Sequence, residues 1–383
     1  MFSGEIDPGA PFCRDAALRW IGCGDDQLPV LLAAARAARD RLKPGFITYS
    51  RKVFIPLTNL CRDYCGYCTF RRDPGQAGAH TMSPEEVLSV VRAGEKLGCT
   101  EALFSLGDKP ELLFPEMRDT LRRLGYRSTL HYLEAMCQQV LRESKLLPHP
   151  NPGLMSAEWI ERLARVSPSM GMMLETTNAG LLRRGAAHDN APDKDPARRL
   201  RVIEEAGKQG VPFTTGLLIG IGETLKDRVD TLIAIRDLQE RYAHVQEVIV
   251  QNFRAKPAIA MADWPEPSHG EMMRTIAVAR LLMPKVNLQA PPNLSADNYE
   301  ELLDAGINDW GGVSPLTPDY INPEKPWPQV EELRRRTEAR GFELRNRLAV
   351  YPEFGARAAA KSPLLARRLA DAAAQDGLAR MAA

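Results

Sequence analysis

Short apolar runs alternate with amphipathic segments over most of the chain. Eight runs are typical of buried strands: VFIPLT (53–58), EALFSLG (101–107), KLLPHP (145–150), GMMLETT (171–177), VPFTTGLLIG (211–220), VQEVIVQNF (245–253), VNLQAPP (286–292) and DWGGVS (309–314). The third and the eighth have the weakest strand character. Runs that are apolar on both faces indicate a parallel sheet covered by helices.

The segments between these runs carry helical periodicity and helical end signals. SPEEVLSVVRAGEKLG begins with Ser83 as N-cap and Pro84 at the first helical position, Glu86 closes a capping box, and Gly98 ends the helix. PARRLRVIEEAGKQG (196–210) and TLKDRVDTLIAIRDLQERYA (224–243) are also amphipathic. The alternation over residues 46–315 predicts an α/β fold, a (β/α)8 barrel of TIM type.

Two flanking regions complete the predicted organisation. Residues 1–45 contain an alanine-rich helix, DQLPVLLAAARAARDRLK (26–43), which ends at Pro44. Residues 316–383 form a C-terminal extension that we expect to pack on the barrel. It contains a helix in PQVEELRRRTEARGFEL (328–344), a strand near RLAVYP (347–352) and a frayed helical end rich in alanine and arginine.

Charge and hydropathy narrow the classes of function. The net charge of +1 and the absence of a dominant basic run give no reason to expect binding to nucleic acid or to an acidic membrane. No apolar stretch reaches the roughly 18 residues of a membrane span. The first residues lack the basic and then apolar pattern of a secretory signal, so we expect a cytoplasmic protein that acts on a small molecule.

Cysteine spacing supplies the most specific chemical signal. The chain has seven cysteines, an odd number that argues against a disulfide framework. Three of them, Cys61, Cys65 and Cys68, form a C-x3-C-x2-C motif directly after the first predicted strand. The other four are scattered and are each expected to be a small buried apolar residue: Cys13, Cys23, Cys99 and Cys137.

Three thiolates so close together indicate a soft metal centre. Structural zinc takes four ligands, and the nearest histidine, His80, lies twelve residues beyond Cys68 without finger-like spacing. A [4Fe–4S] cluster held by three cysteines keeps one iron open for a ligand. Gly66 permits the tight turn that this loop needs. A zinc-binding structural protein remains the alternative from another class.

Polar clusters follow most of the other predicted strands as well. They are SLGDKPE after the second strand, HPNPG after the third, ETTN after the fourth, GIGE after the fifth, QNFRAKP after the sixth and SPLTPDYINP after the eighth. Because a barrel places its chemistry at the carboxyl ends of its strands, we expect these clusters to meet around the cysteine loop.

A C-x3-C-x-aromatic-C motif after the first strand of a β/α barrel resembles the radical S-adenosylmethionine (SAM) superfamily. The resemblance implies that the three cysteines hold a [4Fe–4S] cluster whose open iron binds SAM. The segment around Ser105, Gly107 and Asp108 stands where that superfamily has a Gly-Gly-Glu stretch that receives the SAM amino group. The match is partial, because Leu106 replaces a glycine and Asp108 is shorter than glutamate.

The same resemblance implies further SAM contacts. Glu175 stands where a polar residue holds the ribose hydroxyls, and Arg199 is expected to pair with the SAM carboxylate, with Arg198 and Arg201 as rivals. GLLIGIGE (216–223), which contains Gly220 and Glu223, matches a glycine-rich pattern that packs the adenine. Tyr67 would contribute mainly backbone contacts to the adenine.

More of the chain resembles one family within this superfamily, 7,8-didemethyl-8-hydroxy-5-deazariboflavin synthase. The segments that carry the resemblance are VFIPLTNLCRDYCGYCTFRRDP, SLGDKPE, LLPHPNPG, ETTN, DKDPARRLR, GLLIGIGET and DWGGVSPLTPDYINPEKPWP. The family makes the deazaflavin chromophore of coenzyme F420 with two radical partners. One couples tyrosine to a ribityl-diaminouracil, and the other closes the ring and releases ammonia. GGVSPLTPDYINP resembles the ring-closing partner, with the coupling partner as the alternative.

The resemblance also implies a partner set and a substrate site. A flavodoxin- or ferredoxin-type reductant would supply electrons, and the tyrosine-coupling subunit is a further partner. Polar groups for the substrate are expected at the strand ends, from His149, Asn151, Asn252 and Ser314. Asp319 and Tyr320 are candidates for proton transfer or phenol recognition. The residues do not single out a general base.

Overall fold

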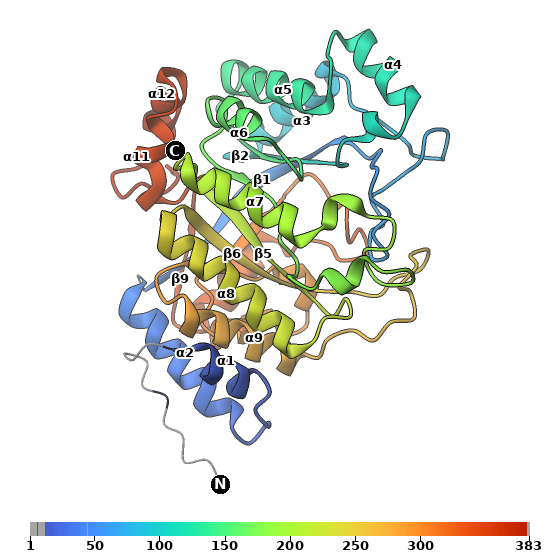
Figure 1. Cartoon of the computed structure of the whole chain (residues 1–383). Coiled ribbons are helices and arrows are strands. Elements are labelled where there is room, and N and C mark those ends of the chain that lie inside the picture. Colours follow the sequence, from blue (N-terminus) through green and yellow to red (C-terminus); the bar gives the residue numbers. More distant parts are fainter. Residues whose placement is uncertain (1–5, 7–11, 44, 381–383) are drawn as a thin grey trace.

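The computed structural model describes residue 6 and residues 12–43 and 45–380 (Figure 1). The predicted helix end at Pro44 and most of the first eleven residues lie outside this part of the chain. Nine strands are described: β1 (Phe46–Thr58), β2 (Glu101–Leu106), β3 (Leu147–Asn151), β4 (Met170–Gly171), β5 (Phe213–Ile219), β6 (Val245–Asn252), β7 (Asn287–Gln289), β8 (Asp309–Val313) and β9 (Glu343–Asn346).

The first eight strands form a nearly closed parallel barrel. Their order is β3-β2-β1-β8-β7-β6-β5-β4, and every ladder between neighbours in this order is parallel. The two ends of the order, β3 and β4, lie beside each other but share no backbone ladder among the described residues. The predicted (β/α)8 barrel is therefore confirmed.

Helices surround this barrel (Figure 1). They are α1 (Arg14–Ile21), α2 (Leu28–Leu42), α3 (Pro84–Lys96), α4 (Pro115–Leu124), α5 (Thr129–Glu143), α6 (Ala157–Ala164), α7 (Pro196–Lys208), α8 (Leu225–Tyr242), α9 (His269–Leu282), α10 (Val330–Glu338), α11 (Gly355–Ala359) and α12 (Pro363–Ala372). The capping box predicted at Ser83 and Glu86 begins α3 as expected. No described helix is long and apolar enough to cross a membrane.

The ends of the chain pack against opposite parts of the barrel wall. Helices α1 and α2 contact α8 and α9. At the other end, β9 pairs in parallel with the first residues of β1, Phe46 to Tyr49. Leu365 and Leu369 of α12 join a buried cluster with Leu141 of α5 and Leu147 of β3. The C-terminal elements thus share buried apolar surface with the barrel.

Four local predictions are corrected. The first strand begins at Phe46 rather than residue 53, because its first half pairs with β8 and β9. The fourth has only two strand residues, and Glu175, beyond its end, adopts φ +66 and joins β5 by an isolated bridge. The last strand precedes the predicted RLAVYP segment. Cys13 is exposed, whereas the other three scattered cysteines are buried as expected.

Candidate functional site

A cavity of about 270 Å3 opens at the carboxyl ends of the barrel strands. It gathers most of the residues predicted from the sequence for cofactor binding, and two predicted for the substrate. Those in its wall are Cys61, Cys65, Tyr67, Cys68, Ser105, Gly107, Asp108, Asn151, Glu175, Arg199 and Asn252. The polar segments after the second, third, fourth, sixth and eighth strands therefore meet around the cysteine loop as expected, whereas GIGE after the fifth strand does not.

The cysteine loop is held by backbone hydrogen bonds to neighbouring loops. The N–H of Gly66 donates to the carbonyl of Ala187 at 2.8 Å, and the N–H groups of Asp63 and Asp108 donate to Cys61 Sγ at 3.4 and 3.2 Å. Gly66 does not have a positive φ. It provides room, because a Cβ there would lie 3.0 Å from the side chain of Met261.

The three thiols line one cavity. Structural zinc takes four protein ligands, whereas a [4Fe–4S] cluster held by three cysteines leaves one iron open. Burial raises the pKa of the Cys61 thiol to about 12, so a metal that binds it must displace a proton.

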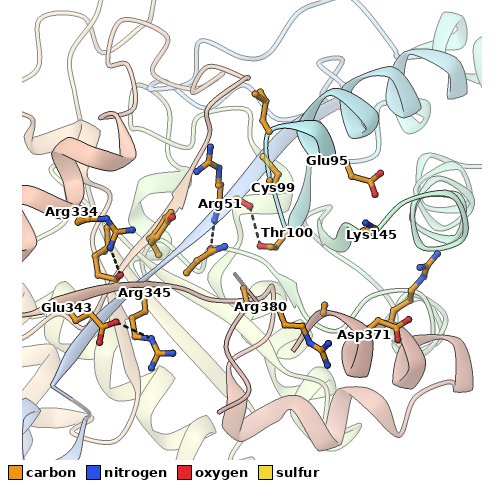
Figure 2. Close-up of a pocket in the computed structure, with 18 residues that line it drawn as sticks. Arg51, Glu95, Cys99, Thr100, Lys145, Arg334, Glu343, Arg345, Asp371 and Arg380 are labelled. Atoms are coloured by element: carbon orange, nitrogen blue, oxygen red, sulfur yellow. Dashed lines mark hydrogen bonds and ion pairs between the residues drawn. The ribbon is translucent and has the colours of Figure 1, made fainter. Parts of the chain in front are cut away.

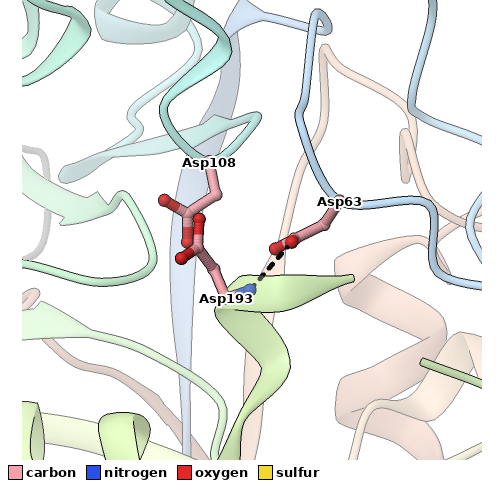
Figure 3. Close-up of side chains that lie close together, drawn as sticks. All are labelled: Asp63, Asp108 and Asp193. Carbon is pink, nitrogen blue, oxygen red and sulfur yellow. Dashed lines mark hydrogen bonds between the residues drawn. The ribbon is translucent and has the colours of Figure 1, made fainter. Parts of the chain in front are cut away.

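Three buried carboxylates, Asp63, Asp108 and Asp193, lie behind this loop within 4.8 Å of one another (Figure 3). Nearby cations compensate them. Asp193 pairs with Arg62, Lys109 and Arg198 at 3.0, 3.3 and 3.0 Å, and Lys109 also pairs with Asp108 at 2.8 Å. Asp63 accepts from the Asp193 N–H at 3.0 Å. The group is therefore a salt-bridge network that joins three loops.

Glu175 is the centre of a second buried network. Its carboxylate accepts from Lys194 at 2.5 Å, from His188 at 3.0 Å and from the Tyr67 hydroxyl. Burial disfavours its charge, but Lys194 and His188 outweigh burial and hold the pKa of Glu175 well below its usual range. Burial also lowers the pKa of His188, so His188 acts as a neutral donor. This network keeps Glu175 charged.

Arg199 provides a buried cation in the cavity wall. It is 4% exposed and donates to the backbone carbonyls of Asp193 and Met173 at 3.0 and 2.5 Å. It forms no ion pair with a carboxylate of the described chain, so its charge is available to an anionic ligand. Asn252 adds a buried Oδ1 that no group of the described residues hydrogen-bonds. Arg199 therefore suits a ligand carboxylate, whereas the Oδ1 of Asn252 suits a hydrogen-bond donor of a polar ligand.

Some predicted residues lie outside this cavity. Glu223 accepts from the backbone N–H groups of Gly220 and Ile221, both at 2.8 Å, and pairs with Arg228. Its carboxylate thus shapes the turn after β5, and neither Gly220 nor Glu223 is part of the cavity wall. From this part of the chain it is Leu218 of β5 that lines the cavity.

The predicted site residues in the loop after β8 also lie outside the cavity wall. Ser314 accepts from the N–H of Thr317 at 2.9 Å, and Asp319 accepts from the N–H of Asn322 at 3.1 Å. Tyr320 packs edge-on against Phe70. Ser314, Asp319 and Tyr320 are absent from the cavity wall. Asp319 therefore holds the loop that brings Ile321 and Asn322 to it: Asn322, rather than its predicted neighbours, lines the cavity.

A second cavity, of about 130 Å3, lies inside the barrel and shares Asn151 with the first. His149 lies here rather than at the rim. Barrel interiors are usually filled by branched apolar side chains. This one instead carries ion pairs from Lys52 to Glu101 at 2.7 Å and from Arg347 to both Asp309 and Glu247, at 2.6 and 2.7 Å.

Sequence patterns missed several residues of these cavities. Lys194 and Lys256 both line the outer cavity, and Lys256 donates to the carbonyl of Ile321 at 2.9 Å. Each lies in a loop whose contacts come from distant parts of the chain, so no local spacing marks it. The interior ion pairs could have been suspected from the sequence, because charged residues stand at apolar positions of strands, as Lys52 does in β1 and Glu247 in β6.

A larger cavity, of about 1010 Å3, lies at the opposite end of the barrel, and Figure 2 shows its lining residues. Its wall comes from residues at the amino ends of the first three strands, such as Arg51, Thr100 and Lys145, and from the C-terminal elements. It contains none of the predicted site residues. Because barrel chemistry lies at the carboxyl ends of the strands, the smaller cavities at the cysteine loop are the candidate site.

Comparison with known proteins places the chain in a family. Residues 55–235 match the model of the radical SAM superfamily. A protein named 7,8-didemethyl-8-hydroxy-5-deazariboflavin synthase, from Methanopyrus kandleri, is 50% identical over 308 residues, which are 80% of this chain and 92% of that protein. The FO synthase of Streptomyces coelicolor is 53% identical over 338 residues. The chain covers 39% of the length of that FO synthase.

Solved structures agree on the fold. Methylornithine synthase superposes with a TM-score of 0.69 at 18% identity, over 88% of this chain and 95% of that protein. The FeFe-hydrogenase maturase of Carboxydothermus hydrogenoformans gives 0.72 at 20% identity, over 94% and 85%. The two cofactors expected from the sequence, a [4Fe–4S] cluster and SAM, are those of the matched superfamily. The chain belongs to the 7,8-didemethyl-8-hydroxy-5-deazariboflavin synthase family of radical SAM proteins.

Proposed function

We propose that this chain closes the deazaflavin ring. It would convert 5-amino-5-(4-hydroxybenzyl)-6-(D-ribitylimino)-5,6-dihydrouracil to 7,8-didemethyl-8-hydroxy-5-deazariboflavin and release ammonia, as a lyase of coenzyme F420 biosynthesis. One observation carries the proposal: the chain is 50% identical over 308 residues to the Methanopyrus kandleri protein named 7,8-didemethyl-8-hydroxy-5-deazariboflavin synthase. GGVSPLTPDYINP after β8 supports the ring-closing partner over the tyrosine-coupling partner.

The cysteine loop and its surroundings fit the cofactors of the superfamily. Cys61, Cys65 and Cys68 would hold the [4Fe–4S] cluster, and the Asp63 and Asp108 N–H groups that reach Cys61 Sγ would stabilise the negative charge of the bound sulfur. When bound, the cluster and SAM supply the one-electron chemistry that removes a hydrogen atom from the substrate.

Other residues of the cavity would bind and orient SAM. Arg199, a buried cation without a carboxylate partner, would pair with the SAM carboxylate. Glu175, kept charged by Lys194, would accept hydrogen bonds from the ribose hydroxyls. The backbone around Ser105 and Gly107 would receive the SAM amino group, and Tyr67 would border the adenine.

The substrate would occupy the space where the two cavities meet. Asn151 lines both cavities, and Asn252 offers its unpaired Oδ1. These amides can pair with the donor and acceptor edge of the uracil ring. Burial of this space excludes water, which protects a reactive substrate from side reactions. We further propose a cytoplasmic location, a flavodoxin- or ferredoxin-type electron donor and a separate tyrosine-coupling partner.

An anaerobic assay tests the proposed reaction. The reconstituted chain is incubated with SAM, a chemical reductant and the preformed hydroxybenzyl-dihydrouracil adduct, and product is followed by the fluorescence of the deazaflavin and by released ammonia. Parallel incubation with tyrosine and 5-amino-6-(D-ribitylamino)uracil tests the coupling alternative. Deazaflavin from the adduct is expected. Product only from the second mixture would overturn the proposal, and one zinc with no iron would end the radical assignment.

A further inference from the structure

His149 occupies a fixed position in the inner cavity. It lies on β3, is 5% exposed, and its Nδ1 lies 2.7 Å from the hydroxyl oxygen of Ser169. Ser169 is itself fully buried, and its hydroxyl also lies 2.5 Å from the carbonyl oxygen of Ala349. A chain of hydrogen bonds therefore runs from the Ala349 carbonyl in the C-terminal extension, through the hydroxyl of Ser169 just before β4, to the imidazole of His149.

The direction of these hydrogen bonds follows from the number of protons. A carbonyl oxygen only accepts, so the single proton of the Ser169 hydroxyl must lie toward Ala349. The Ser169 oxygen can then only accept from His149, whose Nδ1 must carry a proton. In a neutral imidazole the other nitrogen, Nε2, is then unprotonated and can only accept a hydrogen bond.

The surroundings keep the ring neutral. The pKa of His149 is lowered to about 4, mainly by burial, with Glu101 opposing this effect and the positive charges of Lys52 and Arg347 adding to it. The charged residues that line the same cavity are Lys52 of β1, Glu101 of β2, Glu247 of β6 and Arg347 of the C-terminal segment. At neutral pH the imidazole therefore has one proton, and the Ser169 contact determines which nitrogen holds it.

The Nε2 edge is open to the cavity. No described group hydrogen-bonds Nε2, and it is absent from the buried atoms that lack a partner, so it has accessible surface. The neighbouring position is Gly171, where a Cβ would lie 3.1 Å from Nε2. Phe54 and Trp327 line the same cavity as a stacked pair, which suits a flat ring as the ligand.

We infer that Ser169 is a positioning residue that fixes His149 in its Nδ1–H form, so that Nε2 accepts a hydrogen bond from a neutral N–H or O–H donor of a ring bound in the inner cavity. The identity of that ring rests on the proposed function, which offers an imide N–H of the uracil and a phenol O–H. The protonation pattern of His149 is a property of the chain alone. The two claims can therefore fail separately.

Nitrogen NMR of the wild-type chain tests the protonation pattern. The protein is labelled with [15N]imidazole-histidine, and a His149→Gln variant identifies the His149 signals among those of the six histidines. We expect a protonated Nδ1 and an unprotonated Nε2, unchanged between about pH 6 and pH 8. A protonated Nε2, or a ring that gains a second proton within this range, would overturn the inference.

Ser169→Ala tests the role of the contact, with Ser167→Ala as a matched control. Ser167 is equally buried two residues away, and its hydroxyl donates to the Leu163 carbonyl at 2.7 Å. Ser169→Ala should release the tautomer and raise KM for the adduct about five- to tenfold with little change in kcat, as expected for one lost hydrogen bond. Ser167→Ala should change neither. Unchanged nitrogen signals in Ser169→Ala would refute the positioning role.

Two probes show which group, a ring N–H or a phenol O–H, donates the hydrogen bond to Nε2 of His149. 5-Amino-6-(D-ribitylamino)uracil carries the ring N–H, and p-cresol carries the phenol O–H. The probe whose group binds in the inner cavity should shift the Nε2 signal of His149 in a saturable way, and the shift should be smaller in Ser169→Ala than in Ser167→Ala. If neither probe nor the intact adduct shifts this signal, His149 does not contact the ligand and the inference is wrong.

Discussion

Replacing Gly107 with alanine should empty the cysteine site while leaving the barrel folded. Gly107 follows β2, and its N–H donates to the carbonyl of Thr58 at 2.9 Å. A Cβ at this position would lie 1.9 Å from the carbonyl oxygen of Leu60 and 2.7 Å from the Cβ of Cys61. The clash is with backbone, so no side-chain rotation can relieve it.

The size of the effect follows from these distances. Ordinary contact begins near 3.4 Å, so the two loops must separate by about 1.5 Å. This movement would break the hydrogen bond from Arg62 N–H to the Asp108 carbonyl, now 3.2 Å, and the one from Asp108 N–H to Cys61 Sγ. Two lost hydrogen bonds cost about 2 kcal/mol. Because domains have about 5–15 kcal/mol of stability, the variant should still fold.

Iron content after anaerobic reconstitution is the decisive measurement, together with the absorbance near 400 nm and the thermal midpoint. We expect the Gly107→Ala variant to fold cooperatively but to retain well below half of the wild-type iron. Gly355→Ala is the matched control, because its φ of −55° is helical and a Cβ there meets nothing within 4 Å. Wild-type iron content in Gly107→Ala would refute the reasoning.

Three further outcomes are expected. Cys68→Ser should lose most of the iron, whereas Cys137→Ser, at a buried structural thiol, should keep it; equal iron in both variants would count against the cluster assignment. Arg347→Met should lower the free energy of unfolding in urea by about 3–5 kcal/mol, because it leaves two buried carboxylates unpaired; a loss below about 1 kcal/mol would show that they are not held as charges. Stability should also fall as pH drops from about 6.5 to about 4, because burial lowers the pKa of both His149 and His244 to about 4 and the unfolded chain therefore binds more protons. Each contributes roughly 3 kcal/mol over that window. His244→Gln should remove about half of the slope in urea titrations, and an unaltered slope would contradict the account.

Most of the barrel could be predicted because its strands are continuous apolar runs and its helices carry local end signals, as at Ser83. The strand bounds that were predicted wrongly depend on pairing with distant parts of the chain. The strand at Glu343–Asn346 is mostly polar, whereas the segment after it is apolar and has the stronger strand character in sequence. Pairing with the first residues of β1 places the strand at the polar segment. The strand β4 ends at Gly171, and Glu175 has a positive φ; periodicity in the sequence predicts neither feature.

The candidate site divides in the same way. The three cysteines were predicted from their spacing, and Arg199 from the family resemblance with Arg198 and Arg201 as rivals; of the three arginines only Arg199 lines the cavity. Lys194 and Ser169 could not be predicted, because a lysine or serine in a loop is ordinary until the fold brings Glu175 or His149 against it. Asp319 was overvalued for the opposite reason: its carboxylate is occupied by its own loop.

The missing ladder between β3 and β4 has a mechanical consequence. Along every other pair of neighbours, widening the barrel would stretch rows of backbone hydrogen bonds, but here only side chains meet. Both cavities border the gap between β3 and β4. Asn151 of β3 lines both of them, and so do Met172 and Met173, which follow β4. Separating the described strands along this line would therefore break no backbone ladder, whereas separating any other neighbouring pair would.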